Sequence, residues 1–158
     1  MTFEKKQEYT LKISQANKTQ MITIIYEMIM DYLEEAMDEI SIGKKAEGTR
    51  SLMKAQNCID ELLHSLNLKY ELARNLREIY MFSKKELLVA GATYSLHRIW
   101  RVLKNFRSLH EAYVQLEKED GSRQIMGNTQ KVYAGLTYGR YSLNEDVTAY
   151  GMNRGLMA

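Results

Sequence analysis

The sequence predicts an all-α protein: an antiparallel up-down four-helix bundle at residues 18–118, with an N-terminal arm at 1–17 and an irregular C-terminal tail at 119–158. Four successive segments of about 20 residues repeat apolar side chains at helical spacing, without strand signals. The chain contains no proline, so nothing in it forces a long helix to end. Helices of about 30 Å joined by short links favour antiparallel neighbours.

Composition narrows the class of protein further. A chain of 158 residues with 45% apolar side chains is large enough for one domain with a real core. The formal net charge of +2 is too small to indicate nucleic acid or an anionic membrane as a partner. A single cysteine, a polar N-terminal stretch and the lack of a long apolar run predict a cytoplasmic protein that does not insert into a membrane.

The first two elements are an arm and a helix. In the arm, Tyr9, Leu11 and Ile13 form an apolar run at a spacing of two with no partner strand in sight. Asn17 is followed three residues later by Gln20, which has the form of a capping box and places a helix start at residue 18 or 19. A glycine at 43 suits the left-handed position after a helix end, so this helix should reach about residue 42.

Three further helices are expected at residues 45–67, 72–91 and 96–118. Their apolar side chains keep the helical period, and in 45–67 they close an arc of only about 100 to 140°, as in an ordinary amphipathic helix. The last forty residues lose this period. They hold most of the nine glycines together with four tyrosines, so we expect an irregular tail.

The helix at 18–42 differs from the others because its apolar arc spans about 200°. One core cannot use so wide an arc, and monomers rarely expose an apolar patch of that size unless it binds something. We therefore expect a core half, with Ile25 near its centre, and a binding half with Ile29 and Met30. The arc consists of Met21, Ile22, Ile25, Tyr26, Met28, Ile29, Met30, Tyr32, Leu33, Ala36 and Met37.

Constellations for catalysis or metal binding are weak. A di-iron bundle needs two Glu-x-x-His pairs, and the sequence offers only Glu61 with His64, outside the apolar arc of its helix. His110 is isolated on an apolar face, and Cys58 borders a buried arc without a local histidine partner. We therefore expect no enzyme activity, no metal and no cofactor.

A basic comb on the last helix leaves a second class of function open, a small helical regulatory or nucleic-acid-binding domain. The comb winds around nearly 180° of the helix, which favours a solvated helix side over one binding stripe. It consists of Arg98, Arg101, Lys104 and Arg107, with Trp100 and Phe106 interleaved.

Two stretches carry a family resemblance. "LMKAQNCIDELLHSLN" at 52–67 and "ELARNLREIYMFSKKELLVA" at 71–90 closely resemble the middle of the flagellar export chaperone FliS family, and Tyr26 matches a family tyrosine. The resemblance covers roughly residues 9–116. Residues 15–18 depart from the Thr-Ala-Ser-Pro often found there, His110 stands where a tryptophan often occurs, and the tail lies outside the resemblance.

The resemblance implies a cytoplasmic chaperone that binds the C-terminal helical segment of flagellin, prevents premature polymerisation and delivers flagellin to the flagellar export gate. It leaves open a homodimer through the same patch. For Gln56 and Asp60, beside the motif, hydrogen bonding between helices is the alternative role. The partner-binding residues are expected to be Tyr9, Leu11, Ile13, Ile22, Tyr26, Ile29, Met30, Leu33, Gln56 and Asp60.

Two segments outside the bundle carry hypotheses of their own. The arm directly precedes the apolar helix, so it is close enough to fold back on that helix. We expect it to act as a lid, because an empty apolar groove would favour aggregation. Residues 128–158 are expected to wrap over the bundle and to be displaced by flagellin. The alternative for the tail is an extension with no role in binding.

Overall fold

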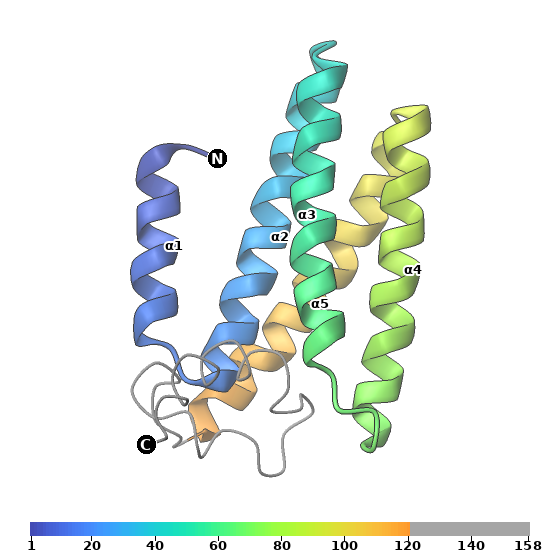
Figure 1. Cartoon of the computed structure of the whole chain (residues 1–158). Coiled ribbons are helices and arrows are strands. Elements are labelled where there is room, and N and C mark those ends of the chain that lie inside the picture. Colours follow the sequence, from blue (N-terminus) through green and yellow to red (C-terminus); the bar gives the residue numbers. More distant parts are fainter. Residues whose placement is uncertain (121–158) are drawn as a thin grey trace, which may run out of the picture.

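The structure is a computed structural model of the chain and describes residues 1–120. This part of the chain holds five α-helices and no strand, so the all-α fold class is confirmed and the expected number of four helices is not (Figure 1). The predictions for the tail from residue 121 onward lie outside the described residues. The helices are α1 (Phe3–Gln15), α2 (Lys18–Ser41), α3 (Lys45–Ser65), α4 (Glu71–Thr93) and α5 (Leu96–Glu119).

The additional helix is α1, which occupies the region expected to be an N-terminal arm. Its start is capped by Thr2, whose side chain accepts a hydrogen bond from the Lys5 backbone N–H. Tyr9 and Ile13, four residues apart, share the face toward the core, whereas Leu11 is 59% exposed. The spacing of two was therefore misleading, because the apolar pair that matters is separated by one helical turn.

The ends of α2 follow the sequence prediction. The Gln20 backbone N–H donates to Asn17 Oδ1 at 2.8 Å, and the Asn17 N–H donates back to Gln20 Oε1 at 3.0 Å, which completes the capping box. Gly43 has a φ of 84°, as expected for the left-handed residue after a helix. These local signals fix where α2 begins and where the chain turns toward α3.

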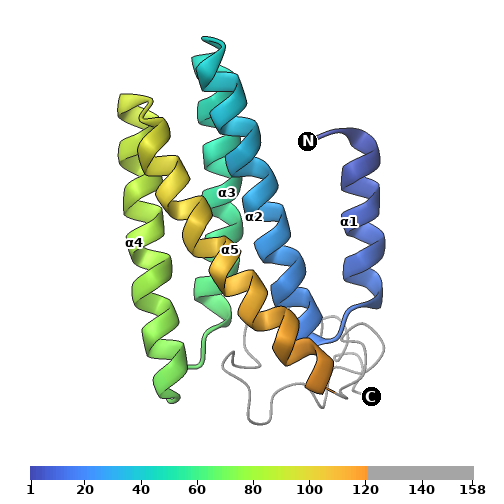
Figure 2. The same cartoon turned by 180° about the vertical axis from the view of Figure 1, so that it is seen from behind.

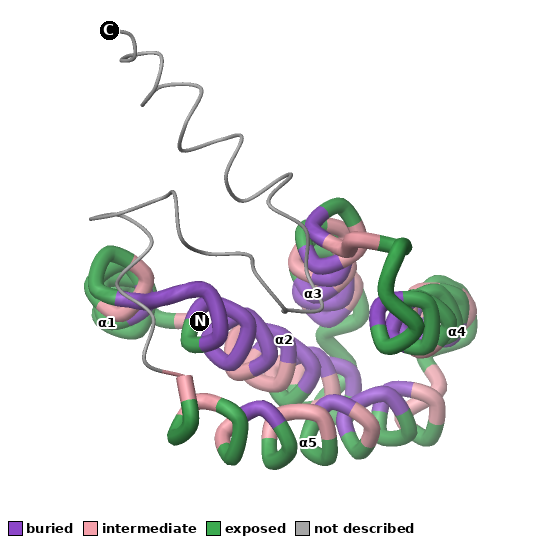
Figure 3. Tube along the Cα trace, turned by 90° about the horizontal axis from the view of Figure 1, so that it is seen from below, coloured by how far each residue is buried: buried purple, intermediate pink, exposed green. Residues whose placement is uncertain are grey.

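Helix α2 is central in this arrangement. It contacts α1, α3 and α5, while α4 packs on α3 and α5. Successive helices reverse direction from α1 to α5, and α5 crosses the others obliquely (Figures 1 and 2). In the view along the helices, most of the α2 trace is buried between its neighbours (Figure 3). The wide apolar arc of α2 therefore serves three packing partners.

An aromatic cluster at the middle of the core ties α2 to α4 and α5. The Tyr26 ring lies 6.4 Å from Tyr80, 5.6 Å from Phe106 and 5.4 Å from Tyr113, measured between ring centroids. The hydroxyl groups of Tyr26 and Tyr80 are hydrogen-bonded at 2.5 Å. Both rings are fully buried, so this bond satisfies polar atoms that have no access to water.

Close packing of α2 against α3 depends on Gly48. A Cβ atom added at this position would lie 2.5 Å from Ile40 Cγ1 and 3.1 Å from the Ala36 carbonyl oxygen. Neither distance is tolerable without movement, and the second contact is with backbone. The absence of a side chain at Gly48 therefore sets how closely these two helices approach.

We predict that Gly48→Ala lowers the free energy of unfolding by about 1–3 kcal/mol, because overpacking outweighs the gain in helix propensity. Gly91→Ala is the matched control, since its Cβ would meet nothing closer than 3.9 Å. That change should stabilise the protein by about 0.4–1 kcal/mol. Denaturant unfolding of both variants measures the difference, and an equal rise in the two midpoints would contradict the proposed close contact.

Candidate partner-binding surface

The surface of α2 that α1 covers is the candidate site, and we call it the α1 seat. Among the described helices, α1 contacts α2 alone, and it stands apart from α3, α4 and α5 (Figures 1 and 2). Tyr9, only 4% exposed, is the one buried residue that α1 itself contributes within this part of the chain. Ile13 packs against the core and remains half-buried. The helix is therefore held by a small apolar contact.

Polar contacts surround the buried Tyr9 ring. The Tyr9 hydroxyl donates to Asp31 Oδ2 at 2.5 Å, and Lys5 Nζ lies 2.9 Å from the same oxygen. Lys12 Nζ lies 3.1 Å from Glu27 Oε2. Burial, followed by the hydrogen bond to the Asp31 carboxylate, raises the pKa of Tyr9 above its ordinary value. The Tyr9 hydroxyl therefore stays protonated at physiological pH and donates a hydrogen bond to the Asp31 carboxylate.

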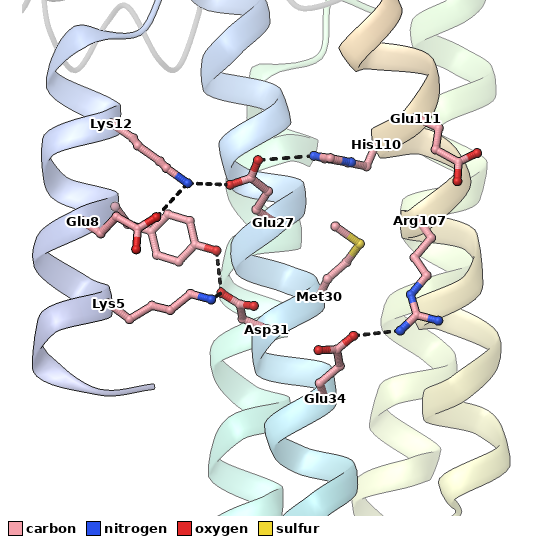
Figure 4. Close-up of a pocket in the computed structure, with 11 residues that line it drawn as sticks. Lys5, Glu8, Lys12, Glu27, Met30, Asp31, Glu34, Arg107, His110 and Glu111 are labelled. Atoms are coloured by element: carbon pink, nitrogen blue, oxygen red, sulfur yellow. Dashed lines mark hydrogen bonds and ion pairs between the residues drawn. The ribbon is translucent and has the colours of Figure 1, made fainter.

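A cleft of about 420 Å³ runs beside these contacts between α1, α2 and α5. On its α5 side, His110 Nε2 lies 3.3 Å from Glu27 Oε1, and Arg107 donates to Glu34 Oε1 at 2.7 Å. Figure 4 shows these side chains reaching toward α2, with Met30 between the two contacts. His110, which the sequence left as an isolated histidine on an apolar face, thus faces a carboxylate at the cleft.

Four α2 residues that were expected to bind a partner lie inside the core in this structure. Ile22 is 2% exposed, and Tyr26, Ile29 and Leu33 are fully buried. The reason is that α3 and α5 both cover α2, so the arc does not divide into a core half and an open half. Met30 differs from them because it is half-buried and lines the cleft. Contact of these residues with a partner stays a prediction.

The two polar residues expected beside the family motif are both half-buried on α3. Asp60 Oδ1 accepts a hydrogen bond from Lys84 Nζ at 2.5 Å, which joins α3 to α4. This contact gives Asp60 the structural role that the sequence left open as an alternative. A role of Gln56 or Asp60 in binding remains a prediction.

The residues considered for catalysis are poorly placed for it. Within residues 1–120, no group of three or more His, Cys, Asp or Glu side chains is arranged to hold a metal ion, and Glu61 and His64 are exposed. Burial, with a smaller effect of Glu61, raises the pKa of the Cys58 thiol to about 11. The thiol is therefore protonated at neutral pH and is not an activated nucleophile.

The basic comb of α5 is engaged within the protein. Arg98 and Arg101 pair with the buried carboxylate of Glu86, at 2.7 and 3.2 Å. Lys104 lies over the Trp100 ring, 5.4 Å from its centroid, and Arg107 pairs with Glu34 on α2. Because these cations have acidic or aromatic partners on different sides of α5, they do not form a free stripe for nucleic acid.

Sequence reasoning missed the charged residues on both sides of the contact between α1 and α2. Lys5, Tyr9 and Lys12 follow the spacing i, i+4, i+7, and on α2 Glu27 and Asp31 are four residues apart. Such spacing places side chains on one face of a helix and could have indicated two complementary stripes. The signal was hidden because residues 1–17 were not considered as a helix.

Fold and surface together describe a helical bundle whose candidate site is the surface of α2 on which α1 packs. The chain belongs to the flagellar protein FliS family, whose profile matches residues 2–120. Members of this family are flagellar export chaperones rather than enzymes; they bind flagellin and act in the cytoplasm. A search of curated proteins found no match to the chain. Among the described helices, none is both long and apolar enough to cross a bilayer.

We predict that Ile29→Asp strongly lowers the free energy of unfolding whereas Met30→Asp does not, because Ile29 lies in the core and Met30 lines the cleft. Ile29 is fully buried, so an aspartate there would leave an unpaired buried charge that costs several kcal/mol, about the size of the whole stability. Met30→Asp should keep the bundle folded, because this side chain borders a polar cleft that contains Arg107 and His110. Circular dichroism with denaturant unfolding checks both. A folded Ile29→Asp variant with an unchanged midpoint would contradict the burial of this position.

Proposed function

We propose that the chain is an export chaperone specific for flagellin, and that the C-terminal helical segment of flagellin binds α2 in the place that α1 occupies. The observation that carries the proposal is the attachment of α1, which touches one helix through one buried side chain and a few ion pairs. Membership of the FliS family supports the class of client. The α1 seat supplies the location.

The physical chemistry of α1 suits a displaceable cover. A helix of 13 residues is marginal alone in water, so α1 depends on its seat for its order. The ion pairs that hold it involve partly exposed lysines, and such pairs contribute little stability. A longer amphipathic helix that buries more apolar area on α2 would therefore replace α1 at a small cost in free energy.

This arrangement also fits the requirements of export. A segment that orders only in the assembled filament must have its apolar face covered in the cytoplasm, and coupled folding on a helical surface does this with modest affinity. While bound, the segment cannot pair with other flagellin molecules, and the complex can carry flagellin to the export gate. With its seat empty, the free chaperone would expose an apolar surface through which a second copy could bind.

We predict that deletion of residues 1–14 tightens binding of a C-terminal flagellin fragment. If α1 docks with about 1–2 kcal/mol, removing this competitor should improve the affinity by about 5- to 30-fold. The deletion should also increase self-association of the free protein. Calorimetric titration and analytical ultracentrifugation measure the two effects.

Gln7→Ala is the matched control for this deletion, because Gln7 belongs to α1 but is exposed and does not line the cleft. It should leave both affinity and oligomeric state unchanged. A deletion variant that stays monomeric and binds flagellin as the full chain does would exclude a covering role for α1.

A further inference from the structure

We propose that the α1 seat recognises a charge pattern as well as an apolar face: it selects a basic helix, antiparallel to α2, with a hydroxylated aromatic residue four positions after one cation and three positions before another. Helix α1 presents this pattern as Lys5, Tyr9 and Lys12. The step from α1 to the client rests on the proposed function. The pattern itself rests on contacts within residues 1–120.

The acidic side of this recognition is built on α2. Glu27 and Asp31 are one turn apart and both face α1, where Asp31 takes the Tyr9 hydroxyl and Lys5 while Glu27 takes Lys12 (Figure 4). The two lysine ammonium groups also lie 5.9 and 5.3 Å from the centroid of the Tyr9 ring, which they bracket. The two carboxylates of α2 therefore contact one aromatic side chain and two cations that lie together on α1.

The residues of α5 that line the cleft explain why the charged residues of a bound helix must stand at fixed positions relative to α2. Arg107 already holds Glu34, and His110 holds one oxygen of Glu27, so the other Glu27 oxygen and Asp31 are the acceptors directed at α1. When α1 leaves, Asp31 gives up both of these contacts and Glu27 gives up Lys12. An incoming helix with an acidic residue at the Lys12 position would face Glu27 and be rejected.

A charge-swap cycle in the full-length chain tests the pattern without a client. Lys12→Glu and Glu27→Lys should each increase amide hydrogen exchange in α1 by about three- to tenfold, while the double variant should recover most of the protection. Lys12 also pairs with Glu8 on its own helix, but this pair is lost equally in Lys12→Glu and in the double variant. Any recovery in the double variant therefore reports the contact with Glu27.

Lys6→Glu is the control for net charge, because Lys6 is an exposed lysine of α1 that does not line the cleft. It should leave exchange in α1 within about twofold of the unmodified chain. Recognition by charge pattern is overturned if the double variant exchanges no more slowly than Lys12→Glu. It is equally overturned if Lys6→Glu has the effect of Lys12→Glu, or if α1 of the unmodified chain is unprotected.

Binding of a C-terminal flagellin fragment to the same full-length variants separates this inference from the proposed function. Lys12→Glu loosens α1 without altering the seat, so affinity should rise; unchanged affinity would contradict displacement of α1 by the client. Glu27→Lys loosens α1 and also alters the seat. Weaker binding by Glu27→Lys supports recognition of a basic helix, whereas tighter binding would overturn it and leave displacement of α1 standing.

Discussion

The packing of α2 against three neighbours is the constraint on which the rest of the structure depends. A helix of 24 residues with so wide an apolar arc would leave part of that arc exposed if it packed against one neighbour only, and it is accommodated because α1, α3 and α5 each cover part of it. Close approach to α3 at Gly48 and the aromatic cluster around Tyr26 both follow from this central position. The position of α1 follows as well, since it covers the part of α2 that the other helices leave uncovered.

The two kinds of contact that α2 makes have different strengths. Toward α3 and α5 it buries large apolar side chains, and its Tyr26 bonds Tyr80 of α4 in surroundings where water cannot replace the lost partner. Toward α1 it offers carboxylates at the edge of a polar cleft, where water can solvate each group once the contact opens. The same helix thus belongs to an apolar core on one side and, on the other, to a more polar contact, which is the one that we propose to be reversible.

Features of the structure could be predicted from the sequence where the residues that determine them are close together in the chain. The capping box at Asn17 and Gln20 and the glycine at 43 lie within a few residues of the helix ends that they define, and both were interpreted correctly. The full burial of Ile29 was not foreseen, because it depends on α3 and α5, which are distant in sequence. The contact between Lys12 and Glu27 was invisible for the same reason, although the spacing of charges on each helix was present in the sequence.

The proposed role of α1 as a cover, held by polar contacts around one aromatic ring, would reconcile two opposing requirements of such a chaperone. An oily surface strong enough to hold an unfolded client would also attract copies of the chaperone, while a cover bound by apolar area alone would be slow to leave. In α1 the buried part is limited to Tyr9 and half of Ile13, and the remaining contacts are ion pairs that reform easily and depend on register. On the proposed displacement of α1, the acidic seat would protect α2 at little cost in free energy, and the geometry of Asp31 and Glu27 would keep the seat selective once α1 has left.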